Sequence, residues 1–267
     1  MSPDFLFCMA YQLLESAGLK DRPCIADKGP REDARGKEGI LTHPKGFTLI
    51  ELMIVIVIIA IIAAIAIPAL LASQRASNER NASASLKTVA TAEADFHAND
   101  RDGDKLQNFW VGDVAGLYCI PTGTTTVPNK LIEISIASAD IDDDGSLYAS
   151  DITSFATIGP KAGYWYQVLI SDASSGTAVA YGSAGGSGGG ATGNNFNNSA
   201  FGFLAFPDVF PNSGKVAFII NENNTQFKRQ MTATLKPASG PGNKVGNADY
   251  DTWPTDTDLK THWAKMD

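Results

Sequence analysis

Two groups of aspartates are the strongest candidates for chemistry in this sequence. The first group follows the spacing of a twelve-residue calcium loop, with acidic residues at positions one, three, five and twelve and glycine at six: Asp140, Asp142, Asp144, Gly145 and Asp151. Such loops surround a hard cation with oxygens, and the glycine permits the tight turn. The twelfth residue is Asp where these loops have the longer Glu, so a solvated acidic turn stays open as the alternative.

The second group, Asp100, Asp102 and Asp104, has alternate carboxylates as well. Its glycine, Gly103, stands between the last two aspartates and not after the third, so it does not fit the calcium-loop order. We therefore favour the first group over the second as a candidate Ca2+ site.

Catalytic motifs find little support. The three histidines, His43, His97 and His262, stand in no metal-ligand or nucleophile motif. The glycine-rich stretch 182–193 lacks the Lys-Ser/Thr of a phosphate loop. The net charge is −8, and no basic patch for phosphate contacts is present. The sequence thus favours a protein that is not an enzyme and has no nucleic-acid partner.

An uncharged apolar segment of 21 residues, Leu52–Ala72, organises the chain. As a helix it would rise about 30 Å, which is the thickness of the bilayer hydrocarbon. Its side chains are apolar all round, unlike those of an amphipathic surface helix, so it predicts a transmembrane helix. Glu51 stands at its edge, where an ionisable residue is costly in lipid, and Pro68 lies inside it, where a kink is expected.

The residues before this segment carry a family resemblance. Lys45-Gly46 followed by Phe47-Thr48-Leu49-Ile50-Glu51 resembles the prepilin peptidase site of type IV pilins and type II secretion pseudopilins. The resemblance extends from Lys45 to about Pro68. It implies that prepilin peptidase cuts between Gly46 and Phe47 and that Phe47 is then N-methylated.

The same resemblance implies an assembly role for two further residues. Glu51 would pair with the N-terminal amine of a neighbouring pilin subunit, and the helix near Pro68 could melt in a filament. The implied partners are other pilin subunits, an inner-membrane assembly platform with its ATPase, and membrane lipid. Basic residues flank both ends of the apolar segment, so the charges do not decide the topology. A single pass through the inner membrane, with a cytoplasmic N-terminus and an exported head, rests on the resemblance.

Residues 1–46 form a leader that is longer and less basic than those of the family. It contains seven basic and seven acidic residues, so the whole charge of −8 lies beyond it. Two interpretations stay open: a genuine leader removed intact, or a start codon set too far upstream, which we favour. In either case the leader is excluded from the fold.

The chain beyond the leader predicts an α+β, pilin-like fold. The apolar helix (47–72) continues as an amphipathic helix over 73–98, which packs on a β-rich head (99–236). Alternating or aromatic runs predict an antiparallel sheet from the strands Tyr164–Ile170, Ala178–Tyr181, Phe201–Phe206, Lys215–Ile220 and Thr225–Met231. The last two form a hairpin, whereas Leu131–Ile136 fits either a strand or a helical turn.

Two segments of the head and tail lack a clear strand pattern. The Gly-, Ser- and Asn-rich stretch 181–200 predicts a flexible loop. The tail, 237–267, is expected to be irregular, docked on the head by Trp253 and Trp263. Thr257 is a candidate cap for a last helix over Leu259–Lys265.

These features favour a structural subunit of a type IV pilus or of a type II secretion pseudopilus, and the sequence does not separate the two. Only Cys119 lies beyond the leader, so the mature chain has no intramolecular disulfide. A membrane-tethered, calcium-dependent binding module is the alternative from another class.

Overall fold

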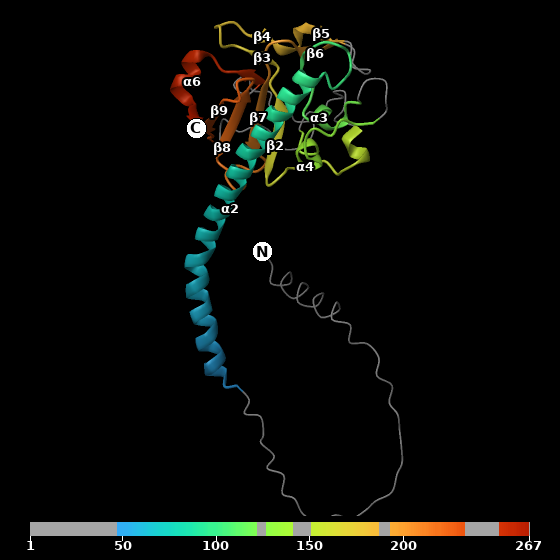
Figure 1. Cartoon of the computed structure of the whole chain (residues 1–267). Helices are drawn as coiled ribbons and strands as arrows, with labels where there is room; N and C mark the ends of the chain where they lie inside the picture. Colours follow the sequence, from blue (N-terminus) through green and yellow to red (C-terminus); the bar gives the residue numbers. More distant parts are fainter. Residues whose placement is uncertain (1–46, 122–126, 141–150, 187–192, 233–250, 267) are drawn as a thin grey trace, which may run out of the picture. The chain divides into compact units, whose positions relative to one another are not determined.

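A computed structural model of the chain describes residues 47–121, 127–140, 151–186, 193–232 and 251–266 (Figure 1). The leader predicted over 1–46 lies outside the described residues. The chain divides into two units, Met1–Leu52 and Met53–Asp267. The helices of the described residues are α2 (Leu49–Asn99), α3 (Gly116–Cys119), α4 (Ile134–Ala137), η1 (Asp151–Ser154), η2 (Tyr181–Ser183) and α6 (Asp256–His262). The strands are β1 (Phe109–Trp110), β2 (Tyr164–Val168), β3 (Ser171–Asp172), β4 (Val179–Ala180), β5 (Ala184–Gly186), β6 (Gly193–Asn197), β7 (Gly202–Pro207), β8 (Val216–Asn221), β9 (Gln226–Gln230), β10 (Thr252–Trp253) and β11 (Ala264–Met266).

The long helix α2 contains 51 residues and continues through Pro68. No glycine interrupts it, and its alanine-rich second half has high helix propensity. Burial begins only at Ala82 and recurs at intervals of three or four residues through Leu86, Val89, Glu93 and Phe96. That spacing places these residues on one helix face, as the sequence predicts for the amphipathic half.

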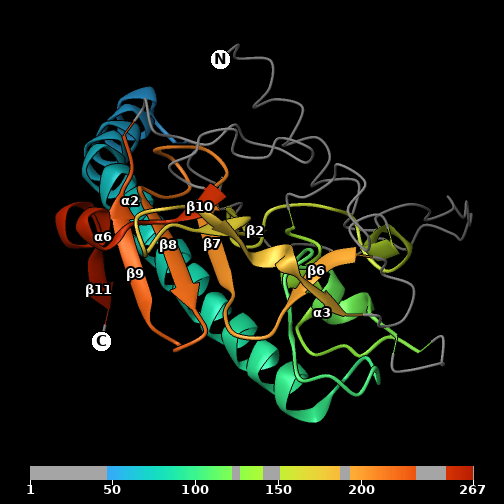
Figure 2. The ribbon, with the colours of Figure 1, turned by 90° about the horizontal axis from the view of Figure 1, so that it is seen from above.

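The main sheet has five strands in the order β11-β9-β8-β7-β2, and every neighbouring pair is antiparallel. The packed half of α2 runs across one face of this sheet (Figure 2). Ser83 of α2 and Gln226 of β9 fix the crossing, because the Ser83 hydroxyl donates to Gln226 Oε1 at 2.7 Å and Gln226 Nε2 donates to the Ser83 carbonyl at 3.1 Å. The predicted α+β architecture is therefore confirmed.

The stretch 181–200 is not the continuous loop that its composition predicts. It contains η2 and the strands β5 and β6, and β6 pairs with both β5 and β1. Phe196 of β6 is opposite Trp110 of β1, and the two buried rings meet edge to face with centroids 5.2 Å apart. Ladder hydrogen bonds need only backbone groups, so one aromatic anchor allows a glycine- and asparagine-rich segment to pair.

The tail is also more regular than predicted. Trp253 and Trp263 are buried, which confirms their docking on the head. Between them lies α6, whose N-cap is Thr255 and not the predicted Thr257, because the Thr255 hydroxyl accepts from the Asp258 amide at 3.2 Å. After Trp263, β11 adds to β9 as the edge strand of the main sheet. Of the two alternatives for Leu131–Ile136, the structure has the helical turn: its last three residues begin α4 (Ile134–Ala137).

Candidate membrane and assembly segment

The helix α2 begins with a side-chain cap at Thr48. The Thr48 hydroxyl accepts a hydrogen bond from the Glu51 amide, and the Thr48 carbonyl accepts one from the Leu52 amide, both at 3.2 Å. Thr48-x-x-Glu51 is the order of a capping box, a signal from which this helix start can be read in the sequence. Phe47 lies just outside the helix with 85% of its surface exposed. Gly46, the other half of the predicted cleavage site, lies outside the described residues.

Glu51 is the third residue of α2, and its side chain is exposed. Within the described ranges, its carboxylate forms no hydrogen bond or ion pair with another side chain. A carboxylate at the centre of a membrane helix costs about 2.5–3.5 kcal/mol. Glu51 is thus a negative charge that gains from any cation brought to it inside or at the edge of lipid.

The apolar segment is bare. Every large apolar side chain from Leu52 to Leu71 is exposed, whereas soluble proteins seldom expose apolar patches of this extent. The helix is long and apolar enough to cross a membrane, and none of its most apolar stretch is buried by other described residues. Covering one Val, Leu or Ile side chain is worth roughly 1.5–3 kcal/mol, so lipid or other protein must cover this surface in a cell.

Pro68 is the one described interruption in the hydrogen bonding of this segment. It has no amide hydrogen, so the carbonyl four residues earlier, at Ala64, loses its helical donor. The helix remains continuous through the position. The predicted melting of the helix at Pro68 in a filament stays a prediction.

The predicted calcium loop falls largely outside the described part of the chain. Asp142 and Asp144 lie outside the described residues. Asp140 is buried beside β2, and its Oδ2 accepts a hydrogen bond from the Ala115 amide at 2.7 Å. Asp151 is exposed at the start of η1. The calcium site at this loop therefore stays a prediction, and one of its four carboxylates already bonds the backbone.

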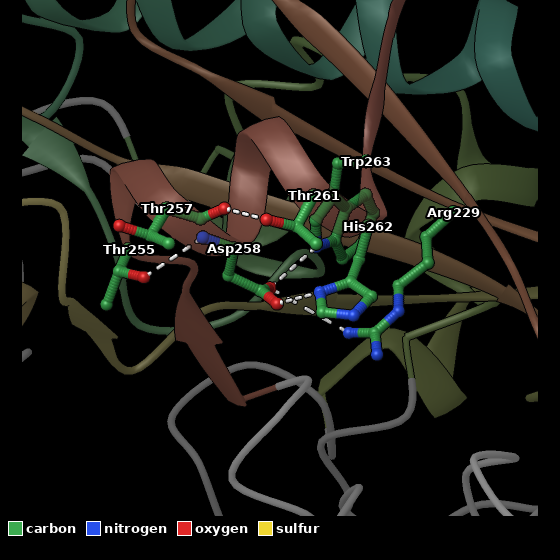
Figure 3. Close-up of polar contacts among 7 residues, drawn as sticks. All are labelled: Arg229, Thr255, Thr257, Asp258, Thr261, His262 and Trp263. Carbon is green, nitrogen blue, oxygen red and sulfur yellow. Dashed lines mark hydrogen bonds and ion pairs between the residues drawn. The ribbon is translucent and has the colours of Figure 1, made fainter.

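The polar cluster on α6 has an anchoring geometry (Figure 3). Asp258 lies at its centre: Oδ1 contacts His262 Nδ1 at 2.5 Å, and Oδ2 accepts from Trp263 Nε1 at 3.2 Å. Arg229 of β9 approaches the same carboxylate at 3.9 Å and lies over the Trp263 ring. Asp258 thus links α6 and Trp263 to Arg229 of the sheet, whereas its contact with His262 lies within α6.

The comparison with protein families finds a match near the start of the chain. Residues 42–67 match the family model of the prokaryotic N-terminal methylation motif, the cleavage and methylation signature of type IV pilins and pseudopilins. The match includes Gly46, Phe47 and Glu51, which confirms the resemblance found at these residues. No curated protein and no solved structure matches the chain.

Proposed function

We propose that this chain is a prepilin, cut between Gly46 and Phe47, whose mature form is a structural subunit of a type IV pilus or a type II secretion pseudopilus. One observation carries the proposal: the methylation motif at residues 42–67 extends into the apolar segment of α2, whose large side chains from Leu52 to Leu71 are all exposed. A motif of this kind on a buried helix would have no such surface to offer for assembly.

Cleavage creates the positive charge that pairs with the Glu51 carboxylate. Removal of residues 1–46 creates an amine at Phe47, and methylation leaves that amine protonated near neutral pH. In a polymer, the amine of one subunit is placed beside the Glu51 carboxylate of the next. The pair replaces an isolated carboxylate in a low-dielectric surrounding, where an uncompensated charge costs most. Recognition between subunits therefore depends on prior cleavage.

The apolar segment serves two successive environments under this proposal. Before assembly, lipid covers Leu52–Ala72, and the peptidase, the assembly platform and its ATPase act on a subunit held in the inner membrane. After assembly, the same side chains pack against the helices of neighbouring subunits. The helix–sheet head, which buries side chains of α2 only from Ala82 onward, remains outside the membrane.

The direct test replaces Glu51 and follows assembly. Glu51→Gln removes the charge and keeps the shape, and we expect normal cleavage with loss of sedimentable polymer from membranes. Glu79→Gln is the matched control on the same helix: Glu79 Oε1 accepts from the Lys215 amide at 3.0 Å, and the glutamine oxygen can keep that bond. Normal polymer from Glu51→Gln would refute the assigned role of the charge.

Pilus and pseudopilus are separated by phenotype. Cells that lack the protein should lose surface filaments in the first case and retain exported proteins in the periplasm in the second. A chain that keeps its leader and remains single in the membrane would instead favour a tethered binding module.

A further inference from the structure

Three carboxylates converge directly after the end of α2. Asp100, Asp102 and Asp104 each present one oxygen, and these oxygens all lie within 4.8 Å of one another. The turn that gathers them connects the last residue of α2, Asn99, to the strand β1. This is the second aspartate group, which sequence spacing alone ranks below the first.

The oxygens of this cluster are only partly used. Asp100 Oδ2 accepts from the Lys105 amide at 3.0 Å, and Asp104 Oδ1 accepts from the Leu106 amide at 2.7 Å. Asp100 Oδ1 and both oxygens of Asp102 are buried and have no hydrogen-bond partner. Asp102 is itself only 2% exposed. A buried carboxylate without partners costs several kcal/mol. The described protein atoms alone therefore leave the carboxylates of this cluster without enough hydrogen-bond or ionic partners.

Among the residues that the structure describes, no basic side chain pairs with this charge. Arg101 lies between two of the aspartates in sequence, but its guanidinium bonds Asp95 at 2.8 Å. In the described part of the chain, no lysine or arginine forms an ion pair with the three carboxylates.

A neutral oxygen at the edge of the cluster gives an independent sign of a missing ligand. Asn108 is 1% exposed, and its Nδ2 lies 3.4 Å from Asp104 Oδ2. Its Oδ1 is buried without any partner. Buried amide oxygens are nearly always bonded. A half-turn of the amide exchanges Nδ2 and Oδ1, which would place this oxygen beside the carboxylates.

We propose that Asp100, Asp102, Asp104 and Asn108 bind one divalent cation, and that calcium is the cation that fits. Oxygens on opposite sides of Ca2+ lie about 4.6–5.2 Å apart, and those around Mg2+ about 4.0–4.2 Å apart. The oxygens of this cluster all lie within 4.8 Å of one another, so they fit inside a calcium shell. Magnesium usually keeps several waters and binds one or two carboxylates, so a set of three carboxylates favours calcium. Backbone carbonyls of the turn and water would complete the shell of six to eight oxygens that calcium takes.

The bound cation joins two parts of the head that the sequence separates. It closes the turn between the end of α2 and β1, whose Trp110 amide donates to the buried Glu93 of α2 at 3.0 Å. Calcium thus stabilises the end of α2 against the head.

The test is calorimetric titration of the full chain in detergent, after chelator treatment, with CaCl2 and then with MgCl2. The unmodified chain should bind one Ca2+ more tightly than Mg2+ and should unfold at a higher temperature with calcium present.

Two double variants with the same charge change separate this site from the predicted loop. D102N/D104N should weaken calcium binding by about a hundredfold, since charge count sets the affinity of oxygen sites. D142N/D144N should bind calcium as the unmodified chain does. A third variant, Asn108→Leu, keeps every charge and should weaken calcium binding while the far-UV circular dichroism spectrum stays unchanged. The proposal is overturned if the unmodified chain binds no calcium, or if binding is lost in D142N/D144N and kept in D102N/D104N.

Discussion

Both parts of α2 are helical, but one exposes its apolar side chains and the other buries them. The apolar segment (Leu52–Ala72) exposes all its large side chains, whereas the packed segment (Ala82–Phe96) buries one face against the head. The apolar segment is rich in Ile and Val on every side, and the packed segment alternates Ala, Leu and Val with polar residues. The difference shows that a segment can be helical whether or not it is buried. The distribution of apolar residues around the helix indicates whether water, protein or lipid surrounds it.

Each segment carries one glutamate that breaks its local rule. Glu51 is a charge at the edge of a surface made for lipid. Glu93 lies in the head, fully buried, with Oε2 accepting from the Trp110 amide and Oε1 without a partner in the described structure. Burial raises the pKa of Glu93 well above its usual range, although the Trp110 hydrogen bond opposes the rise. The folded head therefore stabilises the neutral form of Glu93. Among the described residues, by contrast, no side chain forms an ion pair with the Glu51 carboxylate.

The largest effect should come from truncating the packed segment. Phe96→Ala removes a ring that is 1% exposed, and we expect it to lower the free energy of unfolding of the head by about 3–5 kcal/mol. Ile61→Ala in the apolar segment should change it by less than about 0.5 kcal/mol, as for a surface position. Urea unfolding of the full chain in detergent, followed by tryptophan fluorescence, measures both. Equal losses in the two variants would contradict the division of α2.

A charge in the apolar segment should have a slightly smaller effect, on insertion instead of unfolding. Ile58→Lys should make membrane insertion less favourable by about 2.5–3.5 kcal/mol. Ala84→Lys, on the exposed side of the packed segment, is the control and should leave insertion unchanged. Alkaline extraction of membranes gives the integrated fraction. Unchanged integration of Ile58→Lys would mean that this segment does not enter the hydrocarbon.

The pH dependence of the head tests the buried glutamate. Between the unfolded pKa of Glu93, about 4.3, and its raised folded pKa, the unfolded state loses a proton that the native state keeps. The free energy of unfolding therefore falls as pH rises through this window, by up to about 1.4 kcal/mol per pH unit. Glu93→Gln removes this dependence. The difference between the two unfolding curves should grow in favour of the variant as the pH rises through this window. A constant difference would show that Glu93 ionises equally well in the folded and unfolded states.

The smallest effect is expected at the start of the helix. Thr48→Ala removes the acceptor of the Glu51 amide and should cost the first turn about 1 kcal/mol, while Thr48→Ser keeps the cap. Hydrogen exchange at the Glu51 amide should rise about fivefold in the first variant alone, which is the same free energy expressed as a rate. Equal protection in the two variants would exclude the hydroxyl as the cap.

The sequence predicts those parts of the molecule that a local period defines. The apolar segment, the amphipathic face from Ala82 and the strands β2, β7, β8 and β9 all follow from side-chain spacing. β5, β6 and β11 do not, because their pairing depends on partners distant in sequence and on backbone groups common to all residues. The cluster at Asp100 escapes motif rules for a related reason. Its turn places Asp100, Gly103 and Lys105 at positive φ, a backbone path that no side-chain period indicates.

We propose that cleavage after Gly46 makes the apolar segment of α2 (Leu52–Ala72) available for assembly from the membrane. Mass spectrometry of the N-terminus, on protein extracted from native membranes, tests it most directly. We expect a mature chain that begins at Phe47 with a methylated amine. A chain that retains residues before Phe47, or that begins elsewhere, would contradict the account.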